Sequence, residues 1–124
     1  GKLAVKIASK IGDLKGTKYL QIGKYKDLKK LFKGVKGVEV HHIIEKRFQS
    51  KLFKGVKEAN FMSIPLSKEV HQTITNRWRK AIPYGTNYSN ISYSKMEKAI
   101  KEVYKDMPEL KKQALKWFKQ NWRK

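Results

Sequence analysis

Three histidines are the residues of this chain best suited to acid–base or metal chemistry, namely the adjacent His41 and His42 and the later His71. An imidazole titrates close to neutral pH, so it can serve as a base, an acid or a metal ligand. The adjacent pair lies in an alternating, β-branched segment, 37–44, which predicts a short strand. Because consecutive strand side chains point to opposite sides, one imidazole can bind a metal while the other faces a substrate.

A capped helix is predicted to carry the third histidine. Ser67 is a good N-cap, and the segment 68–80 that follows has apolar residues at helical spacing, Val70, Ile74 and Trp78. His71 falls in the first turns of this helix. We expect the helix to pack on the strand and to bring His71 to the same site as His41.

Asn60 begins a segment, 60–66, that we expect to be extended because Pro65 bars a helix through it. This position would allow the Asn60 side chain to hydrogen-bond the catalytic imidazole and fix its tautomer. A turn residue with a local side-chain hydrogen bond is the alternative interpretation.

The remaining elements are mostly helical. We expect a loosely ordered lead-in over 1–24 with a short strand at 19–22, and a helical turn or a loop over 45–53. Pro108 suits the first turn of a last helix, and Ser94 and Glu97 form a capping box that opens the helix before it. The expected helices span 24–33, 94–106 and 108–122, and residues 83–87 have loop composition.

The charge is the most unusual property of the composition, with 30 Lys and Arg against 10 Asp and Glu and a net charge of +20. Such a field attracts polyanions, which favours nucleic acid as a partner, then an anionic membrane, then an acidic protein. Surface lysine that only confers solubility is the alternative. The lysine-rich stretches 24–36 and 95–119 are expected to be solvated helix faces, for which docking onto a nucleic-acid backbone is a compatible second use.

The chain has no cysteine, so disulfides and thiolate zinc sites are excluded, and a metal would need His, Asp, Glu or Asn ligands. No apolar run approaches the ~20 residues of a spanning helix. The start resembles no signal peptide and lacks an initiator Met, which indicates a domain excised from a longer chain.

Two segments carry a family resemblance, Val-His-His-Ile-Ile-Glu-Lys-Arg-Phe at 40–48 and the helical segment 65–79. They resemble the toxin nucleases at the C-termini of bacterial polymorphic toxins of the LXG or contact-dependent inhibition type. The order of a His pair, an Asn and a helical His resembles the HNH (His-Me finger, ββα-metal) nucleases. The resemblance covers roughly 37–85, and it implies an α+β fold that is mostly helical with a small ββα-metal core. That core would lie within a single domain, 1–124, before C-terminal helices over 94–122.

The resemblance also implies roles for individual residues. His41 and His71 match the metal ligands, His42 matches the general base that activates water, and Asn60 matches the residue that orients this base. Colicin-type relatives carry a further histidine one turn after the helical ligand, where this chain has Thr75. The implied site therefore has two protein ligands for one divalent ion, with Mg, Mn, Ni and Zn not distinguished.

Charged neighbours complete the predicted site. Arg77 or Arg79 could clamp the phosphate, although one of them could be plain surface charge. Lys46 and Arg47 are expected to contact nucleic acid. Glu45 could be an accessory acid or metal-shell group, or a salt-bridge partner of a lysine.

Together these features predict a metal-dependent endonuclease with little sequence preference, for which DNA is favoured over RNA. The resemblance further implies an antibacterial toxin that is secreted and delivered into the cytoplasm of a target bacterium. It implies a cognate immunity protein, which the charge predicts to be acidic. No stable membrane anchor is expected.

Three alternatives remain open from the sequence. In a ribonuclease, His42 would deprotonate the substrate's own 2′-OH and no metal would be required. In a basic binding domain without catalysis, the histidines would be structural. A cationic helix over 94–124 could instead disrupt membranes. The aromatic residues at this end, Trp117, Phe118 and Trp122, are expected to pack in the core rather than to stack on bases.

Overall fold

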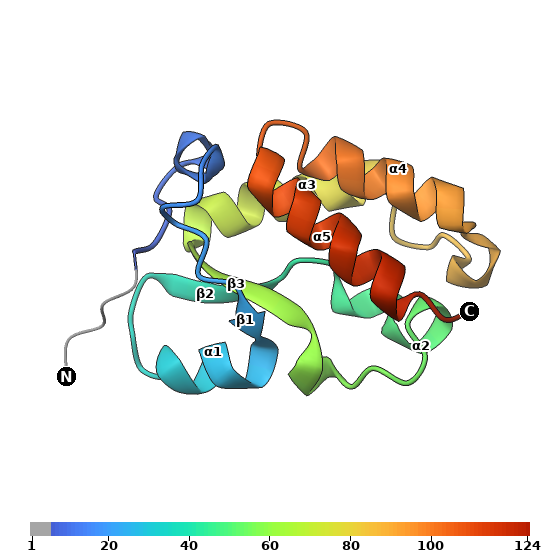
Figure 1. Ribbon diagram of the computed structural model, residues 1–124, viewed down its shortest axis with the longest axis horizontal. Coiled ribbons are helices and arrows are strands. Elements are labelled where there is room, and N and C mark those ends of the chain that lie inside the picture. The colour runs from blue at the N-terminus through green and yellow to red at the C-terminus, as the bar shows by residue number, and fades with distance from the viewer. Residues whose placement is uncertain (1–5) are drawn as a thin grey trace.

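A three-stranded antiparallel sheet separates one helix from a layer of three others in the computed structural model, which describes residues 6–124 (Figure 1). Helix α1 covers one face of the sheet, and α3, α4 and α5 lie on the other side. The α+β class, mostly helical with a small sheet, is thereby confirmed. The elements are β1 (Gly23–Lys24), α1 (Tyr25–Leu31), β2 (Val38–His42), α2 (Gln49–Leu52), β3 (Met62–Ser67), α3 (Lys68–Ala81), α4 (Tyr93–Val103) and α5 (Pro108–Asn121).

Strand β3 is central in the sheet and accommodates a proline, Pro65, which lies opposite Val40 of β2. The amide of Ile43 donates to the Met62 carbonyl at 2.9 Å. Counting along the antiparallel ladder from this pair puts Pro65 at a position whose nitrogen points away from β2. Strand β1 pairs only with the first two residues of β3. The proline therefore removes no hydrogen bond from the sheet.

Strand β3 runs directly into α3, whereas the chain between the paired strands β2 and β3 contains α2 and two 3-10 turns. The Ser67 hydroxyl accepts a hydrogen bond from the Val70 amide at 3.2 Å, as the sequence predicts for an N-cap. Val70, Ile74 and Trp78 are buried on one face of α3. That face packs α3 against the sheet and so determines the direction in which His71 points.

Two predicted boundaries were wrong. The strand expected over 19–22 lies instead at Gly23–Lys24. The Leu20 amide donates to the Thr17 carbonyl, and this hydrogen bond forms a turn before the chain reaches β3. The capping box expected at Ser94 does not open α4. Ser92 caps this helix instead, accepting from the Lys95 amide at 3.1 Å.

The lead-in is packed rather than loose over its described part, and residues 1–5 lie outside the described residues. Ala8 and Leu14 are fully buried, and the Ser67 amide donates to the Ala8 carbonyl at 3.2 Å. This contact fastens the lead-in to the end of β3, which is where α3 begins.

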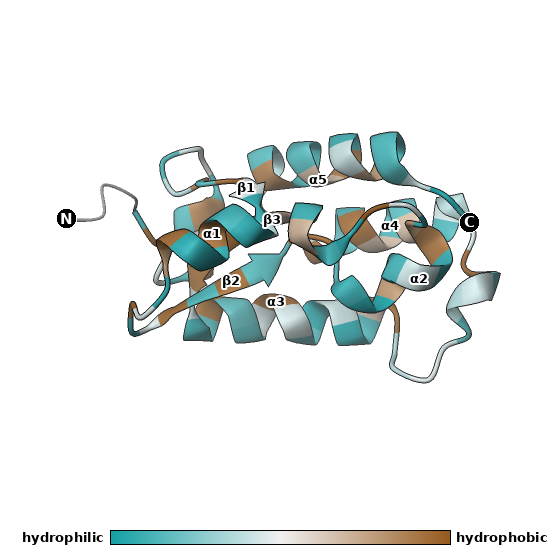
Figure 2. Cartoon of the chain, turned by 90° about the horizontal axis from the view of Figure 1, so that it is seen from below, coloured by the Kyte–Doolittle hydropathy of each residue, from teal (hydrophilic) through white to brown (hydrophobic). Residues whose placement is uncertain are grey.

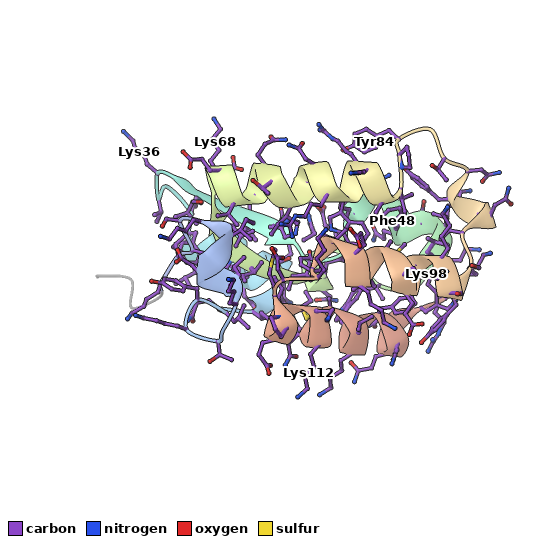
Figure 3. The ribbon with its side chains drawn as sticks, turned by 90° about the horizontal axis from the view of Figure 1, so that it is seen from above. Lys36, Phe48, Lys68, Tyr84, Lys98 and Lys112 are labelled. Carbon is purple, nitrogen blue, oxygen red and sulfur yellow. The ribbon has the colours of Figure 1, made fainter. Side chains whose placement is uncertain are left out.

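The core contains large aromatic side chains from α3, α5 and the two residues that flank α2, Phe48 and Phe53, and the helices turn hydrophilic faces outward (Figure 2). Phe118 is fully buried, and Trp117 and Trp122 pack against the core while partly exposed. The core role predicted for these three residues is confirmed. Lysines such as Lys36 and Lys112 project from the periphery (Figure 3). Across the part of the chain that the structure describes, no helix is long and apolar enough to cross a membrane.

Candidate functional site

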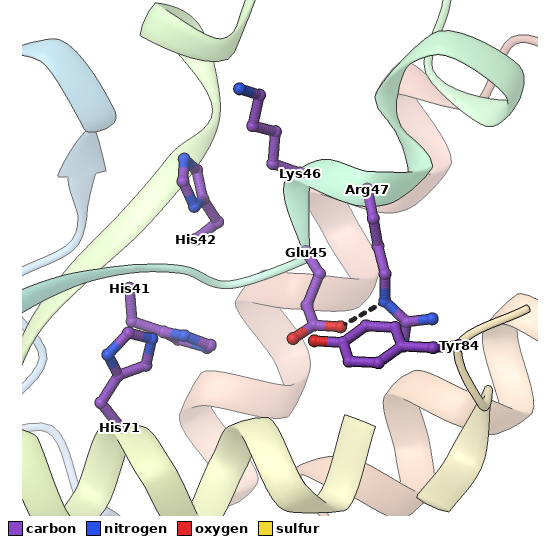
Figure 4. Close-up of a pocket in the computed structure, with 7 residues that line it drawn as sticks. All are labelled: His41, His42, Glu45, Lys46, Arg47, His71 and Tyr84. Carbon is purple, nitrogen blue, oxygen red and sulfur yellow. Dashed lines mark hydrogen bonds and ion pairs between the residues drawn. The ribbon is translucent and has the colours of Figure 1, made fainter. Parts of the chain in front are cut away.

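The adjacent histidines point to opposite faces of β2, as the strand alternation predicts. His41 is buried on the face toward α3 and α4, where its Nε2 lies 3.0 Å from the Tyr104 hydroxyl. His42 faces α1 and stacks on Tyr25, with ring centroids 4.2 Å apart. His71 reaches from α3 to His41, and these two rings meet edge to face at a centroid distance of 4.9 Å (Figure 4).

Tyr104 fixes the tautomer of His41. Its single hydroxyl proton is donated to the Ile43 carbonyl, an oxygen that can only accept. The Tyr104 oxygen must therefore accept from His41, so Nε2 of His41 carries the proton. Trp78 Nε1, at 3.5 Å from the same oxygen, is a second donor to it. A neutral His41 is left with a lone pair on Nδ1.

Burial favours this neutral form. It lowers the pKa of His41 well below its ordinary value, and the nearby imidazoles of His71 and His42 lower it further. Burial also raises the pKa of Tyr104, so this hydroxyl keeps its proton. His41 is consequently neutral at pH 7 and can bind a metal or accept a proton without losing one first.

Glu39 fixes the tautomer of His71 in the same way. Its Oε1 lies 2.7 Å from His71 Nδ1, and a carboxylate can only accept, so the proton is on Nδ1. The neutral ring then has a lone pair on Nε2. In residues 6–124, neither this nitrogen nor Nδ1 of His41 has a hydrogen-bond partner. An acceptor behind each imidazole is the arrangement that orients metal-binding histidines.

These groups line one pocket of about 200 Å³ at the end of β2 (Figure 4). All three histidines contribute to its wall. The lining residues are His41, His42, Glu45, Lys46, Arg47, His71 and Tyr84.

His42 has a different partner, Glu58. Its Nε2 lies 3.0 Å from Glu58 Oε2, although the two groups are not aligned as a hydrogen bond. Lys46 lies 3.3 Å from the other Glu58 oxygen. Burial lowers the pKa of His42, and Glu58 partly offsets this effect. Neutral imidazole is therefore the dominant form at pH 7, as a general base requires.

Asn60 does not meet the imidazole that it was predicted to orient. It is exposed at the end of the 3-10 turn Glu58–Asn60, and its side chain makes no hydrogen bond within residues 6–124. The turn directs the side chain of Glu58 toward His42, and that of Asn60 elsewhere. The residue beside His42 is thus two positions earlier than the sequence suggested.

Glu45 and Arg47 line the pocket but are bonded to each other, with Arg47 Nε 2.6 Å from Glu45 Oε1. The guanidinium of Arg47 also donates to the Trp78 and Ile82 carbonyls and to the Tyr88 hydroxyl. These bonds occupy most of its five donors. Arg47 therefore anchors the segment after β2 to the end of α3, and Lys46, whose side chain is 56% exposed, is the freer cation.

The two arginines of α3 are placed differently. Arg77 binds Asp106 through two hydrogen bonds of 2.8 and 3.1 Å and also donates to the Val103 carbonyl, so it joins α3 to the end of α4. It does not line the pocket. Arg79 is exposed, and its guanidinium lies 5.1 Å from the ring centroid of Tyr84, at the pocket edge.

A divalent metal would find two protein donors here, Nδ1 of His41 and Nε2 of His71. Within residues 6–124 no group of three His, Cys, Asp or Glu side chains is placed to hold a metal ion. The donor set fits an ion that takes its other ligands from water and substrate oxygens. The position of Thr75, one turn after His71, is consistent with that limited set.

Sequence reasoning missed three residues of this site, Glu39, Glu58 and Tyr104. Glu39 shares a strand face with His41, so the period of two could have found it. Tyr104 is far from the histidines in the sequence, and no local pattern marks it. Comparisons with protein-family models, curated proteins and solved structures gave no match to this chain. Its own geometry therefore defines it as a basic α+β domain with a three-histidine pocket.

Proposed function

We propose that this chain is a metal-dependent endonuclease that hydrolyses phosphodiester bonds in nucleic acid, with DNA favoured and little sequence preference. The observation that carries the proposal is the meeting of His41 and His71, each with its tautomer fixed, in a pocket that also contains neutral His42. The net charge of +20 supports a polyanionic substrate.

Each residue has a distinct part in the proposed reaction. His42 removes a proton from the attacking water through Nδ1, while Glu58 beside Nε2 stabilises the imidazolium that results. His41 and His71 would hold a divalent ion, which would supply charge stabilisation for the scissile phosphate and the departing oxygen. Lys46, which is exposed and lines the pocket beside Glu58, supplies a positive charge for the phosphate.

The biological setting follows from the resemblance and is also a proposal. The domain would act as an antibacterial toxin that is secreted and delivered into the cytoplasm of a target bacterium. The cell that makes it would need an immunity protein, and a +20 surface favours an acidic one.

A ribonuclease is the second candidate, because three imidazoles line one pocket and one of them, when protonated, could serve as an acid. A metal-free transfer to the 2′ oxygen needs one base and one acid in the same pocket. The three imidazoles of this pocket could supply both. His42 would then deprotonate the 2′-OH of the substrate itself.

The test is a cleavage assay with the full chain on circular single-stranded DNA, plasmid DNA and total RNA, each with a divalent metal and with EDTA. We expect internal cuts that EDTA abolishes and that His42→Ala abolishes while binding is retained. RNA ends with cyclic 2′,3′-phosphate that persist in EDTA would replace the metal mechanism with the ribonuclease. Binding without cleavage under every metal would leave only a non-catalytic binding domain.

A further inference from the structure

A second concave surface adjoins the histidine pocket. This groove has a volume of about 810 Å³ and runs along β2 between α1 and α3. His71 lines both the pocket and the groove. In Figure 2, β2 lies between these two helices. A chain lying in the groove would therefore end at the candidate site.

The rim of the groove is basic. Three exposed lysines from α1 and the residues after it, Lys29, Lys30 and Lys33, line it. Within residues 6–124 none of these lysines has an ion-pair partner, and the groove has one carboxylate, Glu39, which is hydrogen-bonded to His71. Three lysines against one carboxylate leave the groove with a net positive charge directly beside the pocket.

The floor of the groove is apolar. It is formed by Phe32, Val35, Val38 and Val40. The sheet order makes β2 an edge strand, and the ladder register leaves the backbone amides of Val38 and Val40 pointing outward. Apolar surface suits unpaired bases, and lysines with free amides suit phosphate oxygens.

We propose that this groove binds a single-stranded segment of nucleic acid and leads it to the histidine pocket. The phosphates lie along the three lysines and the bases lie toward the valine floor. In a duplex the bases are stacked inside, so the floor would stay unused. The inference rests on the proposed function, because the groove leads a bound strand to the histidine pocket where that function would take place. It assigns the binding role to the 24–36 lysines rather than to those of 95–119.

The experiment compares two triple variants with the same loss of charge, both in the His42→Ala background to prevent cutting. One carries Lys29→Gln, Lys30→Gln and Lys33→Gln. The matched control carries Lys95→Gln, Lys98→Gln and Lys101→Gln, three exposed lysines of α4 that do not line the groove. Fluorescence anisotropy measures the affinity of each for single-stranded DNA, single-stranded RNA and duplex DNA oligonucleotides of one sequence, at several salt concentrations.

We expect the groove variant to bind both single strands about tenfold or more weakly, with the salt slope reduced by about 2, because each lost phosphate contact removes about 0.7. The control should change little, and duplex binding should depend less on the groove. Equal losses in both variants, or a loss confined to the duplex, would overturn the proposal. Cleavage is not measured here, so a groove effect in a protein that never cuts would disprove the nuclease and leave the groove intact.

Discussion

Two regions of this molecule are rich in rings, and they are held together in different ways. At the C-terminal end, Phe53, Phe118 and Trp122 contact one another edge to face, and their neighbours are mainly other apolar side chains. In the pocket, His41 and His71 also meet edge to face. There, however, each ring depends on one particular oxygen, from Tyr104 or Glu39.

The difference shows what each region can tolerate. An aromatic cluster needs volume and apolar surface, so removing one of its side chains lowers stability by leaving a cavity. A histidine with a fixed tautomer needs one acceptor in one place, so a single-atom change alters its chemistry while leaving its volume intact. Substitutions in the aromatic cluster should therefore lower stability, and substitutions in the pocket should lower activity.

The largest effect is expected for His42→Ala. Removing a general base lowers the cleavage rate by about 10²–10⁴-fold. The ring stacks on Tyr25, meets Phe61 edge to face and pairs with Glu58, and it lies at the edge of the hydrophobic core, so the protein should lose some stability but remain folded. Rates on single-stranded DNA together with thermal unfolding measure both properties. A variant that cuts within about threefold of wild type would remove His42 from the mechanism.

Phe118→Ala tests the aromatic region. The side chain is fully buried, so its loss should lower the free energy of unfolding by about 3–5 kcal/mol. Below the unfolding transition, the activity of the folded protein should be unchanged. Urea unfolding gives the first quantity and initial rates give the second. Selective loss of activity in a stably folded variant would mean that the two regions are not separate.

Tyr104→Phe changes one oxygen at the boundary between the regions. It leaves the His41 Nε2 proton and the Ile43 carbonyl without their partner, which should cost about 1–3 kcal/mol of stability. Activity should fall further than the folded fraction does, because His41 is free to change tautomer. Phe48→Leu, in the core nearby, is the packing control. Equal losses of activity at equal folded fraction in both variants would show that Tyr104 is only structural.

The smallest effect is expected at Asp106, which ties α4 to α3 through Arg77. The hydrogen bonds from Arg77 hold the pKa of Asp106 below its ordinary value. The pair therefore stabilises the fold above the unfolded pKa, near 3.9, and this contribution is lost as the pH falls through the folded pKa. Partial exposure limits it to below about 1 kcal/mol. Urea unfolding of wild type and Asp106→Asn should differ at pH 7, and the difference should shrink as the pH falls through the folded pKa of Asp106, whereas a constant difference would contradict the assignment.

The sequence predicts the fold better than it predicts the contacts of the site. Period and capping signals located α3 and α5, and strand alternation correctly placed His41 and His42 on opposite faces. These signals are local. The boundary of α4 was missed because two serines compete as its cap, and only the tertiary position of the segment decides between them.

The partners of the histidines needed the assembled fold. Tyr104 reaches His41 only after α4 packs on the sheet, and Glu58 rather than Asn60 reaches His42 because of how one turn is wound. Arg77 has a suitable position on the helix, yet Asp106 already binds it. Sequence spacing indicates which residues could do chemistry, and it does not show which of them are already occupied.

The proposed metal site requires two bare imidazole nitrogens facing one pocket, and histidine ¹⁵N–¹H correlation spectroscopy at pH 7 tests this claim most directly. We expect opposite tautomers, with the proton of His41 on Nε2 and that of His71 on Nδ1, assigned with His41→Gln and His71→Gln variants. A His41 that is protonated on both nitrogens, or on Nδ1 alone, would contradict the account.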